Sequence, residues 1–305
     1  MRGFEPVDPR TRRIRLTQGR AAVEVAPGVG GRLAALEVDG WDLLRRDGWT
    51  DREWGAFVMA PWIGRLRNAH VSWGGEAWDV EPSEPPHALH GTIMAVPWAV
   101  ADVSPRTVRM EASLGPDWPM GGHVVHSVAL DEDRVRLTLE VHADRRATPA
   151  IVGWHPWFNR RATRVLPTGR DAIARDAIDE ALRLTDGPRL LETGEVEVLV
   201  DARRRVELDL HGLPTGVLLD PRGDPRDDVL LGVTRPPVVR YPGGPTLHLV
   251  AGGAAAWVVY TGHPDGVCVE PVTGLPDGLN GGLLGEPPVA RPLDPIVATL
   301  EIAWG

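Results

Sequence analysis

The chain has 305 residues, of which 43% are hydrophobic and 25% are charged, a composition typical of globular proteins. Its formal net charge of −9 at pH 7 disfavours nucleic acid and anionic membranes, so we expect neither as a partner. The length allows two average domains or one large all-β domain. No shift in composition marks a boundary, so we expect a single domain over residues 1–305.

Several reaction classes are excluded by residues that the chain lacks. Its one cysteine, Cys268, rules out a disulfide framework and a zinc site built from several cysteines. All 33 Lys and Arg residues are arginine, which rules out Schiff-base chemistry and a P-loop. No window approaches the ~18 apolar residues of a membrane span, and no secretory signal is recognisable. We therefore expect a cytoplasmic protein.

Alternating apolar and polar residues predict β-strands along the chain. In order, they are expected at 107–114, at 134–142, around Leu208 and Leu210, and at 298–304. Such alternation is typical of half-buried antiparallel strands. Turns rich in Gly and Pro separate short strands at roughly 8–12-residue spacing, which favours a β-sandwich or barrel. In residues 171–184 the apolar residues have helical spacing instead. This segment could form a short surface helix, or the surrounding sheet could impose a strand on it.

The first two polar segments, in chain order, are APWIGRLRNA at 60–69 and PPHALHGT at 85–92. In a strand, Arg65 and Arg67 would point the same way and could bind sugar hydroxyls, a carboxylate or a surface partner. His87 and His90 are three residues apart, but the segment is too rich in proline for a helical metal site. We expect no metal.

The third and fourth polar segments are VGWHPWFNR at 152–160 and VCVEPVTGLPDGLN at 267–280. His155 is flanked by bulky aromatic residues, and partial desolvation there would tune its pKa near neutrality; a structural core histidine is the alternative. Alternation with Val267 and Val269 places Glu270 on the opposite strand face, and Pro271 ends the pairing. A carboxylate at such a strand end can enter a cleft or lie on the surface.

As an ordered set, GRLRNA, ALHGT, HPWFN and EPVTGLPDGLN resemble the motifs of the aldose 1-epimerase (galactose mutarotase) family. The resemblance spans roughly residues 20–304, and HPWFN and EPVTG are its specific parts. It implies an all-β fold, a large antiparallel β-sandwich of the galactose mutarotase type. It also implies that His155 is the general acid and Glu270 the general base, and that Arg65 and His90 contact the substrate.

The resemblance further implies a late aspartate that contacts sugar hydroxyls. Asp227 stands at that place, with Asp228 as the alternative. Four positions depart from the residues usual in the family: Gly64, Thr92, Trp157 and Val272. We expect these departures to alter the rim of the substrate-binding site, and we expect Trp157 to be part of that rim.

The function implied by this resemblance is exchange of the α and β anomers of a free aldose, without cofactor or metal, by a monomer or homodimer. One alternative is a hexose-6-phosphate 1-epimerase, which Arg160 and Arg161 beside HPWFN leave open. Another is a non-catalytic carbohydrate-binding protein on the same fold. An acid and a base acting together predict a bell-shaped pH profile centred near neutrality.

Overall fold

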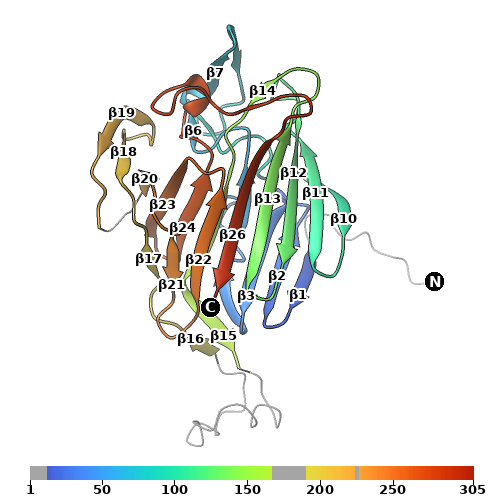
Figure 1. Cartoon of the computed structure of the whole chain (residues 1–305), viewed down its shortest axis with the longest axis vertical. Helices are drawn as coiled ribbons and strands as arrows, with labels where there is room; N and C mark the ends of the chain where they lie inside the picture. The colour runs from blue at the N-terminus through green and yellow to red at the C-terminus, as the bar shows by residue number, and fades with distance from the viewer. Residues whose placement is uncertain (1–11, 167–189, 224–226) are drawn as a thin grey trace, which may run out of the picture.

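The computed structural model describes residues 12–166, 190–223 and 227–305, which form two large antiparallel sheets packed as a sandwich (Figure 1). This confirms the predicted fold class. The larger sheet has twelve strands in the described part of the chain, in the order β1-β2-β3-β4-β15-β24-β23-β20-β18-β19, with β5 and β16 also paired to β15. Their bounds are β1 Ile14–Gln18, β2 Ala21–Ala26, β3 Arg32–Val38, β4 Trp41–Leu44, β5 Ala56–Met59, β15 Gly153–Val165, β16 Leu190–Glu192, β18 Arg204–Leu208, β19 Pro214–Leu219, β20 Asp227–Leu231, β23 Ala256–His263 and β24 Gly266–Val272.

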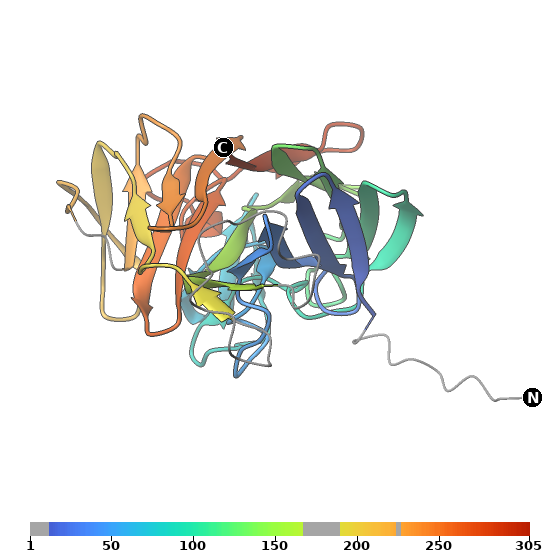
Figure 2. The ribbon, with the colours of Figure 1, turned by 90° about the horizontal axis from the view of Figure 1, so that it is seen from below.

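The smaller sheet has eight strands over the same residues, in the order β10-β11-β12-β13-β26-β22-β21-β17. Figure 1 shows it in front of β1 to β3, and Figure 2 shows the two layers from below. Its strands are β10 Ala99–Val103, β11 Thr107–Ser113, β12 His123–Leu130, β13 Arg134–His142, β17 Glu197–Leu199, β21 Val238–Arg240, β22 Thr246–Gly252 and β26 Ile296–Trp304.

Three two-stranded sheets and two single 3₁₀ turns complete the elements that the structure describes. The pairs are β6 (Arg65–Leu66) with β9 (Ala88–Leu89), β7 (His70–Trp73) with β8 (Glu76–Asp79), and β14 (Thr148–Pro149) with β25 (Val289–Ala290). The turns are η2 (Arg67–Ala69) and η5 (Gly278–Asn280). Across the described ranges, no helix is long and apolar enough to cross a membrane.

The predicted strands agree with the observed ones where alternation is strict. β13 spans the predicted residues 134–142, and Val135, Leu137, Leu139 and Val141 are all fully buried against the other sheet. The strand around Leu208 ends earlier than predicted, because Asp209 accepts hydrogen bonds from the backbone of His211 and Leu213 and turns the chain. The ambiguous segment 171–184 lies outside the described residues.

The sandwich interior fixes which face of β15 is left for other uses. Trp154 points inward, where its indole Nε1–H donates to His126 Nε2 of β12 at 3.2 Å. Because side chains alternate along a strand, His155 and Trp157 point to the outer face of the twelve-stranded sheet. The inner face is core, and the outer face is free to carry polar side chains.

Candidate active site

β15 and β24 bring His155 and Glu270 together. The two strands are paired with Gly153 opposite Val272 and Trp157 opposite Cys268. Gly153 permits the close approach at this point, since a Cβ there would lie 2.4 Å from the carbonyl oxygen of Pro271. Thr273 then anchors the end of β24, because its Oγ1 accepts from the Val152 backbone N–H at 2.9 Å.

The side chains of His155 and Glu270 are in direct contact on the outer face. His155 Nε2 lies 3.3 Å from Glu270 Oε1. Both residues are nearly buried, with 8% and 3% of their surface exposed. The pair therefore has little contact with solvent.

Aromatic rings enclose the imidazole of His155. Phe57 of β5 stacks on it with centroids 4.6 Å apart, and Trp157 stacks at 5.4 Å. His90 meets the same ring edge-on at 5.2 Å and 90°. Trp157 is itself fixed, because its indole N–H donates to the Arg52 carbonyl at 2.7 Å. Trp157 is thus a buried wall of the site.

The two-stranded sheet of β6 and β9 holds Arg65 and His90 next to each other. Arg65 is paired with Leu89, and the His90 backbone N–H donates to the Gly64 carbonyl at 3.0 Å. Gly91 lets the chain turn back after His90: its φ is +79°, and a Cβ there would lie 1.9 Å from the Ala60 carbonyl oxygen. The LHG motif therefore has a steric reason for its glycine.

Burial controls the charge of the central groups. Desolvation lowers the pKa of His155 to about 3, and the charge of Arg32 acts in the same direction. Desolvation raises the pKa of Glu270 well above its usual value, helped by the charge of Asp227. The expectation of a near-neutral pKa for His155 is wrong, because its ring is almost fully covered. Desolvation also lowers the pKa of His90, and neighbouring positive charges, including Arg65, add to it.

The strand register separates the two candidate aspartates. Trp157, Cys268, Tyr260 and Asp227 are paired in a row across β15, β24, β23 and β20, so they share the outer face. Asp228 points to the other face, where it is 2% exposed and its Oδ1 lies 3.2 Å from Arg222 Nη2.

Arg65 and Asp227 line one cavity of about 440 Å³, together with residues of the β18–β19 hairpin and with Arg222 and Asp228. The His155–Glu270 pair is not part of that lining. Desolvation raises the pKa of Asp227, and the charge of Arg65 opposes that rise. The cavity carries several guanidinium and carboxylate groups, and Arg65 and Asp227 are the two whose charges act on His90 and Glu270 of the central cluster.

Three other residues singled out in the sequence, Arg67, His87 and Arg160, contact other groups of the protein instead of joining the candidate site. Arg67 does not follow Arg65, because Asn68 adopts a φ of +52° and turns the chain; Arg67 Nε instead donates to Asp277 at 3.0 Å. His87 Nδ1 accepts from the Asn68 backbone N–H, and its ring faces His211. Arg160 bonds to Glu195 and to the carbonyls of Thr261 and His263.

Phe57 and Tyr260 were missed in the sequence. Phe57 lies in the fully buried strand AFVM, where both faces are apolar and nothing distinguishes a site residue from a core residue. Tyr260 contacts Trp157 edge-on at 5.9 Å. Since it alternates with the buried Val259 on an ordinary strand, only the pairing across the sheet reveals its place beside the site.

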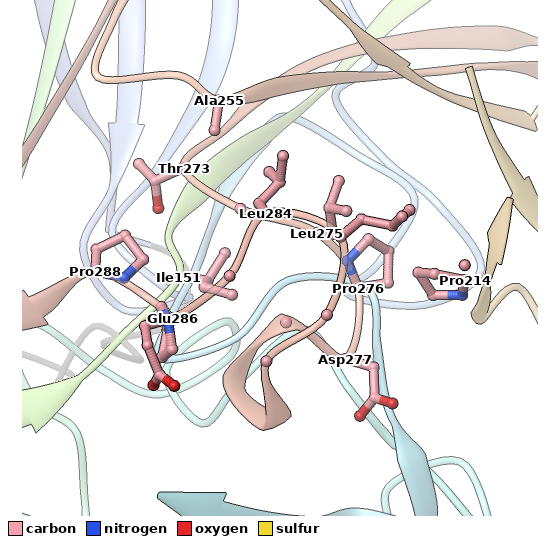
Figure 3. A pocket seen from close by; sticks show the side chains of 18 of the residues that line it. Ile151, Pro214, Ala255, Thr273, Leu275, Pro276, Asp277, Leu284, Glu286 and Pro288 are labelled. Atoms are coloured by element: carbon pink, nitrogen blue, oxygen red, sulfur yellow. The ribbon is translucent and has the colours of Figure 1, made fainter. Parts of the chain in front are cut away.

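A second cavity, of about 470 Å³, lies under the loop that follows β24 (Figure 3). Its lining is mostly glycine, proline and leucine, including Leu275, Leu284 and Pro288. Asp277 at its edge already accepts hydrogen bonds from Arg67 and Asn280. Its lining includes none of His155, Glu270, Arg65, His90 and Asp227, so this cavity is not assigned to the candidate site.

Comparison with known proteins agrees with the architecture. The family model of aldose 1-epimerase matches residues 12–280. A candidate aldose 1-epimerase of Escherichia coli K12 superposes with a TM-score of 0.76 at 16% identity, covering 96% of this chain and 99% of that one. A galactose mutarotase-like protein of Clostridium acetobutylicum gives 0.75 at 14% identity, covering 96% and 95%.

Galactose 1-epimerase of Lactobacillus acidophilus NCFM gives a TM-score of 0.70 at 16% identity, covering 96% of this chain and 94% of that one. At this identity the structural likeness speaks for the fold alone. A sequence search of curated proteins found no match. The family model covers most of the chain, and the protein therefore belongs to the aldose 1-epimerase family.

Proposed function

We propose that this protein interconverts the α and β anomers of a free aldose, with His155 as general acid and Glu270 as general base. The observation that carries the proposal is the contact of 3.3 Å between His155 Nε2 and Glu270 Oε1 on the outer sheet face. Membership of the aldose 1-epimerase family supports the same reaction class.

Anomer exchange needs one proton removed and one delivered on the same sugar. Glu270 removes the proton of the C1 hydroxyl while His155 protonates the ring oxygen, and the ring opens to the aldehyde. After rotation about C1–C2, the carbonyl presents its other face. The ring then closes with the two roles reversed, and each positioned group is worth about 10²–10⁴-fold in rate.

A single proton on the pair is sufficient for the whole cycle. With the proton on His155, the two residues form an ion pair, which opens the ring. With the proton on Glu270, both side chains are neutral, and this form closes the ring. Burial favours the neutral form, since it lowers the pKa of His155 and raises that of Glu270. The two forms are related by one proton transfer, so the enzyme is regenerated without net uptake from solvent.

The remaining polar residues are assigned to binding. Arg65 and Asp227, in the adjoining cavity, present donors and acceptors for sugar hydroxyls. His90 touches the His155 ring and is kept neutral by burial, so it can exchange hydrogen bonds with a hydroxyl without adding charge. Trp157 and Phe57 orient the acid rather than the sugar.

A sugar phosphate is less well supported as substrate. Arg160 is occupied by Glu195 and two backbone carbonyls. Arg161 donates to the Thr193 carbonyl and lines a different cavity, next to Arg45 and Arg46. Neither arginine contributes to the cavity that holds Arg65 and Asp227.

The test is polarimetry on freshly dissolved α-galactose and α-glucose, with the spontaneous rate subtracted. We expect acceleration by the wild-type protein and a loss of about 10²–10⁴-fold in kcat for His155→Gln and for Glu270→Gln. The surface variant His142→Asn is the control and should keep the wild-type rate.

A carbohydrate-binding protein without activity would bind the sugar and leave the optical rotation on its spontaneous course. That result, or full activity in both variants, would overturn the proposal. Acceleration with glucose 6-phosphate and none with free sugars would favour the phosphate-specific alternative.

A further inference from the structure

Cys268 completes a three-ligand cluster with the acid and the base. One ring nitrogen of His155, the Sγ of Cys268 and a carboxylate oxygen of Glu270 all lie within 4.8 Å of one another. All three residues are more than nine-tenths buried. Cys268 and Glu270 are two apart on β24 and Cys268 is paired with Trp157, so the three side chains share the outer face.

The spacing of these atoms is close to that of ligands around one tetrahedral metal ion. With metal–nitrogen and metal–oxygen bonds of about 2.0–2.2 Å, two tetrahedral ligands lie about 3.3–3.6 Å apart. His155 Nε2 and Glu270 Oε1 are already 3.3 Å apart. Movement of about 1 Å would bring Sγ from the outer limit of 4.8 Å to a bonding position.

The donor set selects the kind of ion. A thiolate with an imidazole and one carboxylate suits Zn²⁺ or Cd²⁺, whereas Mg²⁺ and Ca²⁺ prefer oxygen ligands throughout. A thiolate and a carboxylate together neutralise a divalent ion, so the buried site would gain no net charge. The protons of the thiol and of the acid–base pair would pass to the solvent on binding.

We propose that His155, Cys268 and Glu270 form a site for a thiophilic divalent cation, Zn²⁺ or Cd²⁺, whose occupation inhibits the protein. The ion would engage the only acid and the only base of the pair, and both would be lost to the sugar. The inhibition rests on the proposed function, while the binding of the ion does not.

Binding is measured first, by isothermal titration calorimetry of the wild-type protein with Zn²⁺, Cd²⁺ and Mg²⁺. We expect one Zn²⁺ or Cd²⁺ per chain and no binding of Mg²⁺. Cys268→Ser should weaken Zn²⁺ binding by more than about 100-fold, since even outer-shell partners of a metal are worth 10–100-fold. Thermal unfolding of this variant checks that it is folded.

The matched control is His142→Asn, which removes one ring of the stacked surface pair His123 and His142, 4.9 Å apart. This variant should bind Zn²⁺ as the wild type does. Loss of binding in the control, or undiminished binding in Cys268→Ser, would place the ion elsewhere and overturn the proposal.

Cd²⁺ gives a readout that does not depend on a variant. Cys268 is the one cysteine of the chain, so a thiolate-to-Cd²⁺ charge-transfer band in the ultraviolet must come from it. We expect the band to saturate at one Cd²⁺ per chain and to disappear when Zn²⁺ is added. No band at saturating Cd²⁺ would refute the site, even if Cys268→Ser failed to fold.

Inhibition is measured separately, by polarimetry, relative to the metal-free rate of each variant. We expect micromolar-range Zn²⁺ to abolish the accelerated mutarotation of the wild type, and Cys268→Ser to resist it by the same factor as in binding. A Cd²⁺ band without any accelerated mutarotation would refute the proposed function and leave the site standing. Binding without any change in rate would refute the inhibition.

Discussion

The imidazole of His155 lies nearly flat against the phenyl ring of Phe57, with centroids 4.6 Å apart and planes inclined by 22°. The two residues are directly paired between β15 and β5. Phe57 is fully buried and also meets His90 edge-on at 5.6 Å, so its effect on the chemistry must pass through the orientation of these two imidazoles, above all His155.

We expect Phe57→Leu to lower kcat by about 10- to 100-fold with little change in KM, because a shift of ~1 Å in a reacting group is worth up to about 100-fold. Phe158 is the matched control. It is also fully buried, but it follows Trp157 on β15 and points to the inner face. Phe158→Leu should cost a similar stability, about 1 kcal/mol, and keep kcat. Equal kcat values for the two variants would refute a positioning role for Phe57.

Asp227 and Asp228 give a second pair of matched variants. Asp227→Asn should raise KM about 10-fold, because it weakens one hydrogen bond to the sugar. The free energy of unfolding should stay nearly unchanged. Asp228→Asn should lower the free energy of unfolding by about 1–3 kcal/mol, because its buried carboxylate bonds to Arg222, and leave KM unchanged. Initial rates and denaturant unfolding of both variants measure this, and the reverse pattern would assign substrate contact to Asp228.

The rate should depend on pH through the pair as a unit. The active pair holds one proton: a second proton removes the base, and loss of the first removes the acid. Because burial lowers the pKa of His155 to about 3 and raises that of Glu270, we expect a broad bell whose acid limb falls well below pH 6.5. The profile of kcat/KM for galactose, corrected for spontaneous mutarotation, measures it. An acid limb centred at 6.5 or higher would contradict a buried, neutral His155.

Stability should depend on pH through a different histidine. His126 is fully buried, its Nδ1 lies 2.9 Å from the Gly31 carbonyl and its Nε2 accepts from Trp154, so its neutral form is required. Burial lowers its pKa from 6.5 to about 4. The unfolded chain thus takes up the proton first as pH falls, and about 3 kcal/mol present above pH 6.5 is lost by pH 4.

Denaturant unfolding at pH 7 and pH 4.5 measures this loss. His126→Gln should be less stable at pH 7 but should lose less between the two values, while His142→Asn should follow the wild type. His155 and His90 also have lowered pKa values, so the free energy of unfolding of His126→Gln should still depend on pH to some extent. An unchanged slope in His126→Gln would show that His126 does not carry the effect.

The sequence was most informative where one rule acts locally. The strict alternation of residues 134–142 predicted both ends of β13 correctly. The alternation in β24 predicted that the side chain of Glu270 lies on the strand face opposite to those of Val267 and Val269. The ordered motifs singled out His155 and Glu270, which the fold brings into contact although they are 115 positions apart in the sequence.

The sequence was least informative where distant segments meet. The coverage of His155 depends on Phe57, Trp157 and His90, which come from three separate stretches, and no local pattern reports how completely they desolvate the ring. Arg67 points away from Arg65 because Asn68 adopts a left-handed φ, and the alternation of apolar and polar residues cannot reveal such a φ. Cross-strand pairing, rather than any motif, set Asp227 apart from Asp228.

Trp154 and His155 are consecutive, yet one closes the interior and the other faces the outer side, where it contacts Glu270. Inserting or deleting a single residue just before them would exchange their positions, driving an imidazole into the core and an indole into the reaction centre. Length changes are therefore barred from this strand by folding and by chemistry at once. Changes of length are expected in the connections around this strand rather than in the strand itself.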